Sequence, residues 1–173
     1  MWSAFRGSPD DEFDTVADAE AEVLRTLDGK WGPFSADASL VAVIAGEVVA
    51  AVLTVFDDAH GRIPLLAFAV IAPERQGRGL GGWLIENAVR SLDVVGITEL
   101  HLAVAPMNPA RRLYERLGFM EIGPCDAPAD SGVEQGGRQM RCVADLWRRA
   151  GDPGGPAVPS LVRYCRLVHR FLD

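Results

Sequence analysis

Two stretches, one near the N-terminus and one in the middle of the chain, have apolar residues at the spacing of an amphipathic helix. In VADAEAEVLRTL the apolar positions recur at helical spacing, and Thr15 followed three residues later by Asp18 is a weak capping-box signal for its start. A second helix is predicted over residues 80–92, where Leu80, Leu84 and Ala88 form one apolar stripe.

The segment NPARRLYERLGF is the clearest helix in the sequence. Asn108 suits the N-cap and Pro109 the first turn. The apolar stripe follows at i, i+3, i+4 and i+7, and it consists of Ala110, Leu113, Tyr114 and Leu117. Gly118 and Phe119 then have the pattern of a C′ glycine followed by its hydrophobic contact.

Strand patterns surround these helices. SLVAVIAGEVVAAVLTVF predicts two strands joined by a tight turn at Ala45-Gly46-Glu47, and the continuously apolar IPLLAFAVIA predicts a strand covered on both faces. LHLAV, FMEIG and RQMRCVADL predict shorter strands, the last two separated by a polar loop. Because hairpins interrupt the alternation of strands and helices, we expect a mixed sheet rather than a regular parallel one.

Composition and charge narrow the class of protein. The 173 residues suit one domain, and a formal charge of −7 gives no general attraction to nucleic acid. No apolar run approaches the ~20 residues of a membrane helix, and no signal core is evident, so a cytoplasmic protein without a membrane contact is expected. Three cysteines without CxxC spacing, together with His60, His101 and His169, predict neither a disulfide framework nor a metal site.

The sequence QGRGLGG places four glycines between a strand and a helix, namely Gly77, Gly79, Gly81 and Gly82. Each glycine inside a helix costs about 1 kcal/mol relative to alanine, so the cluster needs a reason other than stability. One reason is an anion site of backbone N–H groups at the helix N-terminus, and the other is a tight turn with close helix–strand packing. A Walker loop is excluded because no Lys-Ser or Lys-Thr follows, and the preceding hairpins argue against a dinucleotide fingerprint.

Two motifs then resemble the signatures of the GNAT N-acetyltransferase superfamily. IAPERQGRGLGG is similar to V-x-P-x-x-[QR]-x-x-G-x-[GA], with matches at Ile71, Pro73, Gln76, Gly79 and Gly81. NPARRLYERLGF is similar to N-x-x-x-x-x-Y-x-x-x-G-F, with matches at Asn108, Tyr114, Gly118 and Phe119. The resemblance spans about residues 40–146 and implies an α/β (α+β) fold, a mixed and mostly antiparallel twisted sheet flanked by helices.

The resemblance implies acetyl-CoA as co-substrate and assigns residues to it. The backbone of the strand before the loop would pair with the pantetheine arm, through Ala69, Val70 and Ile71. The pyrophosphate would rest on the backbone amides of Gln76, Gly77, Arg78, Gly79, Leu80, Gly81 and Gly82, and Asn108 would contact the cofactor near the reaction centre. Tyr114 resembles the general acid that protonates the departing sulfur, and a main-chain N–H near Ile71 would hold the oxyanion. Nearby positive charge would come from Arg75, Arg78, Arg111 and Arg112, each of which could instead belong to a solvated face.

The general base stays open. Many relatives place a glutamate on the strand before the glycine loop or on the strand before Asn108, whereas this chain has no carboxylate on the first and Ala103 on the second. His101 lies two residues earlier on the same strand face and is either the base or a structural histidine. Asp57, Asp58 and His60, at the end of a hairpin, could attract a cationic amine or simply form the turn.

The acceptor and the two ends of the chain are predicted only in outline. The acceptor would be a small-molecule amine, a protein N-terminus or a lysine. No strand before the first helix is obvious, and WSAFR is a poor candidate for the family's usual first strand. We expect the acetyltransferase domain at residues 1–149, a linker at 150–159 and an amphipathic C-terminal helix at 160–173. That helix would pack on its own domain or on a second subunit, as in a homodimer. The rival to an enzyme is a catalytically idle domain of the same fold that senses acetyl-CoA or serves as a subunit.

Overall fold

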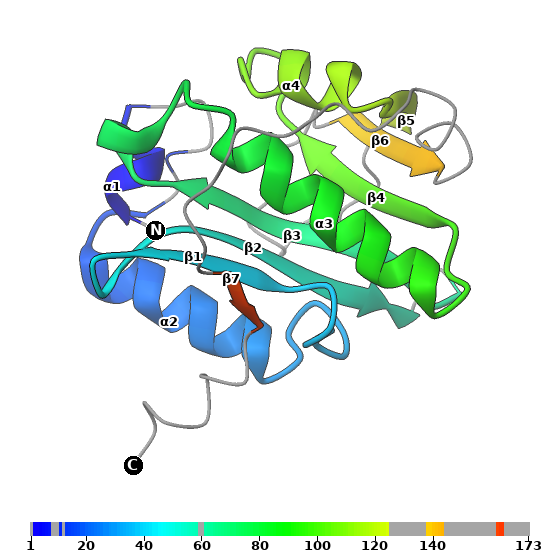
Figure 1. Cartoon of the computed structure of the whole chain (residues 1–173), viewed down its shortest axis with the longest axis horizontal. Helices are drawn as coiled ribbons and strands as arrows, with labels where there is room; N and C mark the ends of the chain where they lie inside the picture. The colour runs from blue at the N-terminus through cyan, green and yellow to red at the C-terminus, as the bar shows by residue number, and fades with distance from the viewer. Residues whose placement is uncertain are drawn as a thin grey trace.

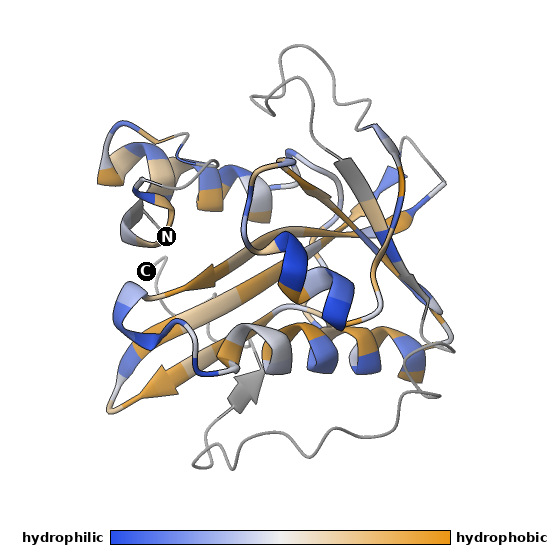
Figure 2. Cartoon of the chain, turned by 90° about the horizontal axis from the view of Figure 1, so that it is seen from above, coloured by the Kyte–Doolittle hydropathy of each residue, from blue (hydrophilic) through white to orange (hydrophobic). Residues whose placement is uncertain are grey.

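The computed structural model describes residues 2–7, 11, 13–58, 61–124, 138–143 and 162–164. These form one sheet with helices on both sides (Figures 1 and 2). The strands, in chain order, are β1 (Leu40–Ile44), β2 (Glu47–Asp57), β3 (Ile63–Ile71), β4 (Glu99–Val104), β5 (Met120–Pro124), β6 (Arg138–Val143) and β7 (Val162–Tyr164). The helices are α1 (Trp2–Phe5), α2 (Val16–Leu27), α3 (Leu80–Val94) and α4 (Arg111–Arg116), with a 3₁₀ turn, η2, at Pro73–Arg75.

The strand order in the sheet is β5-β6-β4-β3-β2-β1-β7. Every neighbouring pair is antiparallel except β3 and β4, which are parallel and are joined through α3. The predicted mixed and mostly antiparallel sheet is therefore confirmed. The tight turn between β1 and β2 is also where it was predicted, and both Ala45 and Gly46 have positive φ there, as a two-residue type I′ hairpin requires.

Helix α3 covers one face of the sheet and supplies much of the core. Its buried residues are Gly82, Leu84, Ile85, Ala88, Val89 and Leu92. They pack with alternate residues of the strands, including Leu100, Leu102 and Val104 of β4. The apolar stripe of α3 thus packs against the face of β4 to which alternate residues of that strand point.

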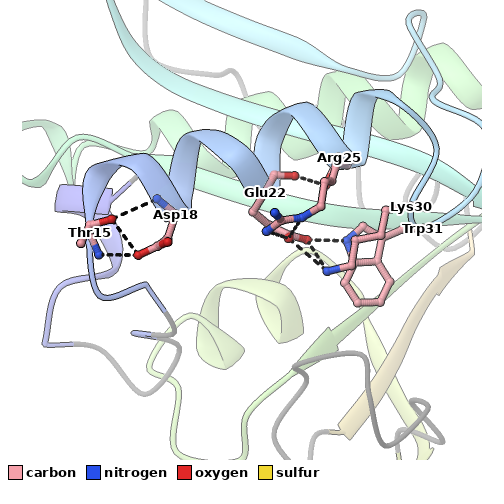
Figure 3. Close-up of polar contacts among 7 residues, drawn as sticks. Thr15, Asp18, Glu22, Arg25, Lys30 and Trp31 are labelled. Atoms are coloured by element: carbon pink, nitrogen blue, oxygen red, sulfur yellow. Dashed lines mark hydrogen bonds and ion pairs between the residues drawn. The ribbon is translucent and has the colours of Figure 1, made fainter.

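Helix α2 begins with the predicted capping box. The Thr15 side chain accepts a hydrogen bond from Asp18 N at 3.2 Å, and the Asp18 carboxylate accepts one from Thr15 N at 3.0 Å (Figure 3). Near the other end of α2, the buried Glu22 accepts hydrogen bonds from Arg25, Lys30 and Trp31. This cluster ties the helix to the loop that follows it.

The predicted C-terminal helix is wrong at Val162–Tyr164, which form β7 and pair antiparallel with β1 through Leu40 and Tyr164. Valine and tyrosine favour strands, and without β7 the strand β1 would be a sheet edge with unpaired backbone groups. Residues 144–161 and 165–173 lie outside the described part of the chain, so the domain limit at 149 and the linker at 150–159 stay predictions.

In the described part of the N-terminal region no strand precedes α2, and the chain at Trp2–Phe5 is helical.

Candidate active site

The candidate site lies where β3 and β4 part. Both strands are fully described, yet they pair only at Leu65 and His101. Just beyond that pair β3 contains a bulge, because Leu53 and Thr54 of β2 lie opposite Phe68 and Leu66 and leave Ala67 as the extra residue. A bulge bends its strand and increases its twist, which accounts for the divergence of β3 from β4.

The last residues of β3 carry backbone groups that face this opening. Ala72 N donates to Val49 O on β2 at 2.8 Å, which fixes the side to which each residue points. Because the N–H and C=O of a strand residue point to the same edge and alternate along the strand, Val70 faces β2 while Ala69 and Ile71 face away from it. The Ile71 carbonyl accepts a hydrogen bond from Gln76 Nε2 at 3.2 Å. The Ile71 N–H and both backbone groups of Ala69 therefore lie along the edge that β4 has left.

The four glycines after β3 serve two different purposes. Gly77 and Gly79 have φ of 71° and 80°, a left-handed backbone that favours glycine. An added Cβ at Gly81 would lie 3.4 Å from Ile71 Cδ1, and one at Gly82 would lie 3.4 Å from Leu113 Cδ1. The second pair therefore allows α3 to approach β3 and α4 closely.

The same loop presents backbone donors at the N-terminus of α3. In the described part of the chain, no backbone carbonyl accepts from the N–H groups at positions 77–80. Such groups point out of the first turn of the helix at the positive end of its dipole. The loop can therefore accept an anion as well as make a turn.

The N-cap of α4 is Ala110, two residues after the predicted N-cap Asn108. Asn108 Oδ1 accepts a hydrogen bond from Ala110 N at 2.7 Å, and Asn108 O accepts one from Arg111 N at 3.1 Å. The first turn is thus of the tighter 3₁₀ kind, and the regular helix starts at Arg111. Asn108 still organises the turn through its side chain.

The end of α4 is the predicted glycine cap, and it fixes Tyr114. Phe119 N donates to Tyr114 O and Gly118 N donates to Glu115 O, both at 3.0 Å, while Gly118 has φ of 84°. This is a Schellman motif. The Tyr114 ring packs against Phe119 with ring centroids 5.8 Å apart, and Tyr114 is 9% exposed. Its ring is part of the core.

The arginines near the site differ in their surroundings. Arg111 binds Glu115 at 3.0 Å and Glu121 at 2.8 Å, and these hydrogen bonds raise the pKa of its guanidinium. It therefore balances carboxylates of its own chain. Arg75 is half-buried with no described partner for Nε, and Arg78 lies exposed in the glycine loop.

His101 is 8% exposed and lies at the point where the strands part. Its Nε2 is 3.2 Å from Glu99 Oε2, and the same oxygen is 3.5 Å from Arg141 Nη1. Of the residues predicted to attract a cationic amine, Asp57 pairs with Ile63 at the end of β3 away from the glycine loop, and the adjacent Asp58 is exposed. His60 lies outside the described residues.

Two structural features are absent from the described residues. No group of three or more His, Cys, Asp or Glu side chains in those residues is placed to hold a metal ion. None of the described helices combines the length and the apolar character needed to cross a membrane.

The chain is similar to known proteins in sequence and in fold. Over 56 residues the chain is 43% identical to the spermidine N(1)-acetyltransferase of Vibrio cholerae, and the match covers 31% of this chain and 32% of that enzyme. The fold is similar to that of PH1933 from Pyrococcus horikoshii OT3, with a TM-score of 0.58, 20% identity and coverage of 83% and 87% of the two chains. It is also similar to a GNAT family acetyltransferase from Elizabethkingia anophelis solved with acetyl-CoA bound, with a TM-score of 0.51, 15% identity and coverage of 61% and 74%.

The family assignment rests on the sequence of most of the chain. Residues 3–119, which include both motifs, match the acetyltransferase (GNAT) family. The family uses acetyl-CoA, and its fold contains the mixed sheet seen here. The chain therefore belongs to the GNAT family of acetyltransferases.

Proposed function

We propose that this protein is an acetyl-CoA-dependent N-acetyltransferase that transfers the acetyl group directly to a primary amine. The observation that carries the proposal is the parting of β3 and β4 beside the glycine loop. It leaves a strand edge and a set of helix N-terminal donors side by side, in a chain of the GNAT family.

The residues present fit acetyl-CoA. The unpaired edge at Ala69 and Ile71 would hold the amides of the pantetheine arm as a neighbouring strand does. The backbone N–H groups between Gln76 and Gly82 would hold the pyrophosphate at the N-terminus of α3, where the helix dipole favours negative charge. Asn108 lies at the turn after β4 and would contact the cofactor near the reaction centre. In a protein of charge −7, the exposed Arg78 supplies local positive charge for this anionic partner.

Acetyl transfer from a thioester to an amine requires three groups: a proton acceptor, a donor to the oxyanion and a proton donor to the sulfur. A lysine-like amine with a pKa near ~10.4 must lose a proton before it attacks, which His101 would accept directly or through water. The main-chain N–H near Ile71 would stabilise the negative charge that develops on the carbonyl oxygen. Tyr114 would donate its phenolic proton to the departing sulfur, because sulfur leaves more readily as a neutral thiol than as a thiolate anion.

The acceptor class is proposed from the relative. The Vibrio cholerae enzyme is named for spermidine, a small amine, and its match covers about a third of each chain. A small-molecule amine is therefore our first choice, ahead of a protein N-terminus or a lysine side chain.

The test is release of the coenzyme A thiol from acetyl-CoA across polyamines, aminoglycosides, amino acids and peptides. Tyr114→Phe keeps the ring that packs on Phe119 and removes only the hydroxyl, so the variant should fold and bind acetyl-CoA as before. Turnover with one acceptor class, lowered about 100-fold or more in the variant, supports the proposal. Tight binding of acetyl-CoA without turnover on any amine would replace it with the non-catalytic sensing domain.

A further inference from the structure

His101 faces the side of the sheet opposite α3. Leu100, Leu102 and Val104 belong to the core beneath α3, so the alternation along β4 turns His101 the other way, together with Glu99 and Ala103. His101 is also the β4 residue at the last contact with β3 before the strands part. His101 is thus at the inner end of the opening in which the acetyl donor is proposed to lie, with its side chain on the face opposite α3.

The polar contacts of the ring are specific. Glu99 Oε2 is 3.2 Å from His101 Nε2, and the side chain of Glu99 is 38% exposed. Arg141 lies opposite His101 in the β4–β6 register, and its Nη1 is 3.5 Å from the same Glu99 oxygen. The charged groups placed against the imidazole in the described structure are thus Glu99 from its own strand and Arg141 from β6. Strand β3 contributes the apolar Leu65.

We propose that Glu99 is a positioning residue that fixes the tautomer of His101, so that Nδ1 is the atom that accepts the proton from the acceptor amine. This inference rests on the proposed function. A neutral imidazole has one N–H, and a carboxylate can only accept, so the contact with Glu99 places that N–H on Nε2. Nδ1 then carries the lone pair, and no described residue is bonded to it.

The proton balance follows from this arrangement. His101 Nδ1 takes one proton from the ammonium form of the acceptor, directly or through water, and becomes an imidazolium beside the Glu99 carboxylate. The freed amine forms the new C–N bond to the acetyl carbon as the C–S bond breaks, and Tyr114 supplies the proton to the sulfur. The amine nitrogen loses its second proton to the Tyr114 oxygen, and His101 returns its proton to solvent. Arg141 would keep the Glu99 carboxylate aligned throughout.

The experiment combines nitrogen NMR of the histidine rings with steady-state kinetics. The ring nitrogens of the two neutral tautomers differ in chemical shift, and His101→Gln identifies the His101 signals among the three histidines by their loss. We expect the Nε2–H tautomer in the wild type and a mixture of tautomers in Glu99→Gln. We further expect kcat to fall at least about tenfold in Glu99→Gln, with KM for acetyl-CoA unchanged, because a mispositioned base affects the chemical step.

Glu121→Gln is the matched control, because it also removes a strand carboxylate paired with an arginine but does not touch the imidazole. It should leave the His101 signals and kcat unchanged. An Nδ1–H tautomer in the wild type overturns the inference, as does a Glu99→Gln variant with wild-type signals and kcat. The NMR result is independent of turnover, so the absence of acetyl transfer to any amine would refute the proposed function without being mistaken for a failure of the tautomer assignment.

Discussion

The Glu22 cluster offers a stability test that can be worked out from its contacts. Glu22 is 6% exposed, and its two carboxylate oxygens accept from Arg25 Nη2 at 2.7 Å, Lys30 Nζ at 3.0 Å and Trp31 Nε1 at 2.9 Å (Figure 3). Trp31 lies at the start of the loop that the bridge between Phe34 and Val55 joins to β2. The cluster therefore links α2 to the sheet. Glu22→Gln keeps the shape of the side chain and removes its charge.

The expected loss of stability in Glu22→Gln depends on which of these contacts the glutamine side-chain amide can keep. The Gln oxygen can still accept from Trp31, whereas the Gln NH₂ group would face the donors of Lys30 or Arg25. Arg25 is 54% exposed, so its pair contributes about 0–1 kcal/mol. Lys30 is 33% exposed, and its charged hydrogen bond contributes about 1.5 kcal/mol. The variant should be about 2 kcal/mol less stable, which corresponds to a Tm lower by about 4–8 °C.

The difference in stability between the wild type and Glu22→Gln should also depend on pH. Burial opposes the ionisation of Glu22, but the hydrogen bonds from Arg25, Lys30 and Trp31 outweigh it and hold the pKa of the carboxyl below its ordinary value of 4.5. A carboxyl with a lowered pKa in the folded state contributes stability that is present above the unfolded pKa and is lost as the pH falls through the folded one. The gap between wild type and Glu22→Gln should thus be full above pH 4.5 and shrink in more acidic buffer.

Urea unfolding at several pH values measures both effects. Glu20→Gln is the control, since Glu20 is an exposed carboxylate on the same helix, and its stability should stay within about 0.5 kcal/mol of the wild type. Equal stability of Glu22→Gln and Glu20→Gln at neutral pH would refute the role of the cluster. A gap that does not change between neutral and acidic buffer would refute the assignment of the effect to the charge.

Two glycine substitutions test other features of the fold. Gly32→Ala should lose about 3 kcal/mol or more in urea unfolding, because its Cβ would lie 1.9 Å from Phe56 O and its φ is 111°; a loss below 1 kcal/mol would contradict this packing. Gly77→Ala should lose only about 1–2 kcal/mol, since its φ is 71° but its Cβ would meet nothing within 4 Å. Gly46→Ala, with φ of 88° and equally open space, should lose as much stability, yet only Gly77→Ala should weaken acetyl-CoA binding in calorimetry. Equal affinity in both variants would mean that the glycine loop does not hold the cofactor.

The elements that could be predicted from the sequence are those whose signals are local. The capping signal of α2 joins Thr15 to Asp18, only three residues apart, and the structure contains both of its backbone hydrogen bonds. Gly118 and Phe119 close α4 by contacts within five residues. In each case the residues that decide the structure are close in the chain, so their spacing is sufficient evidence.

The β3 bulge could not be predicted, although it shapes the candidate site. A bulge shifts the alternation by one residue, and such a shift is visible only where apolar and polar residues alternate. IPLLAFAVIA is apolar throughout, so the change at Ala67 leaves no mark on the pattern. The C-terminal strand was missed for a related reason. Its partner β1 is more than a hundred residues away, and SLVRYCRLVHRFLD has helical spacing of its own.

The two sides of the proposed reaction therefore differ in how the sequence encodes them. The proposed acetyl-CoA side would use backbone groups at Ile71 and the glycine loop, and such groups require only a short motif that fixes the chain's path. The proposed acceptor side would depend on which side chains the register of β4 and β6 brings together, here Glu99, His101 and Arg141. A register shift of one residue would turn Arg141 to the other face and separate it from Glu99. GNAT proteins with the same motifs can thus differ in their proton acceptor, and cross-strand neighbours such as these are the positions at which to compare them.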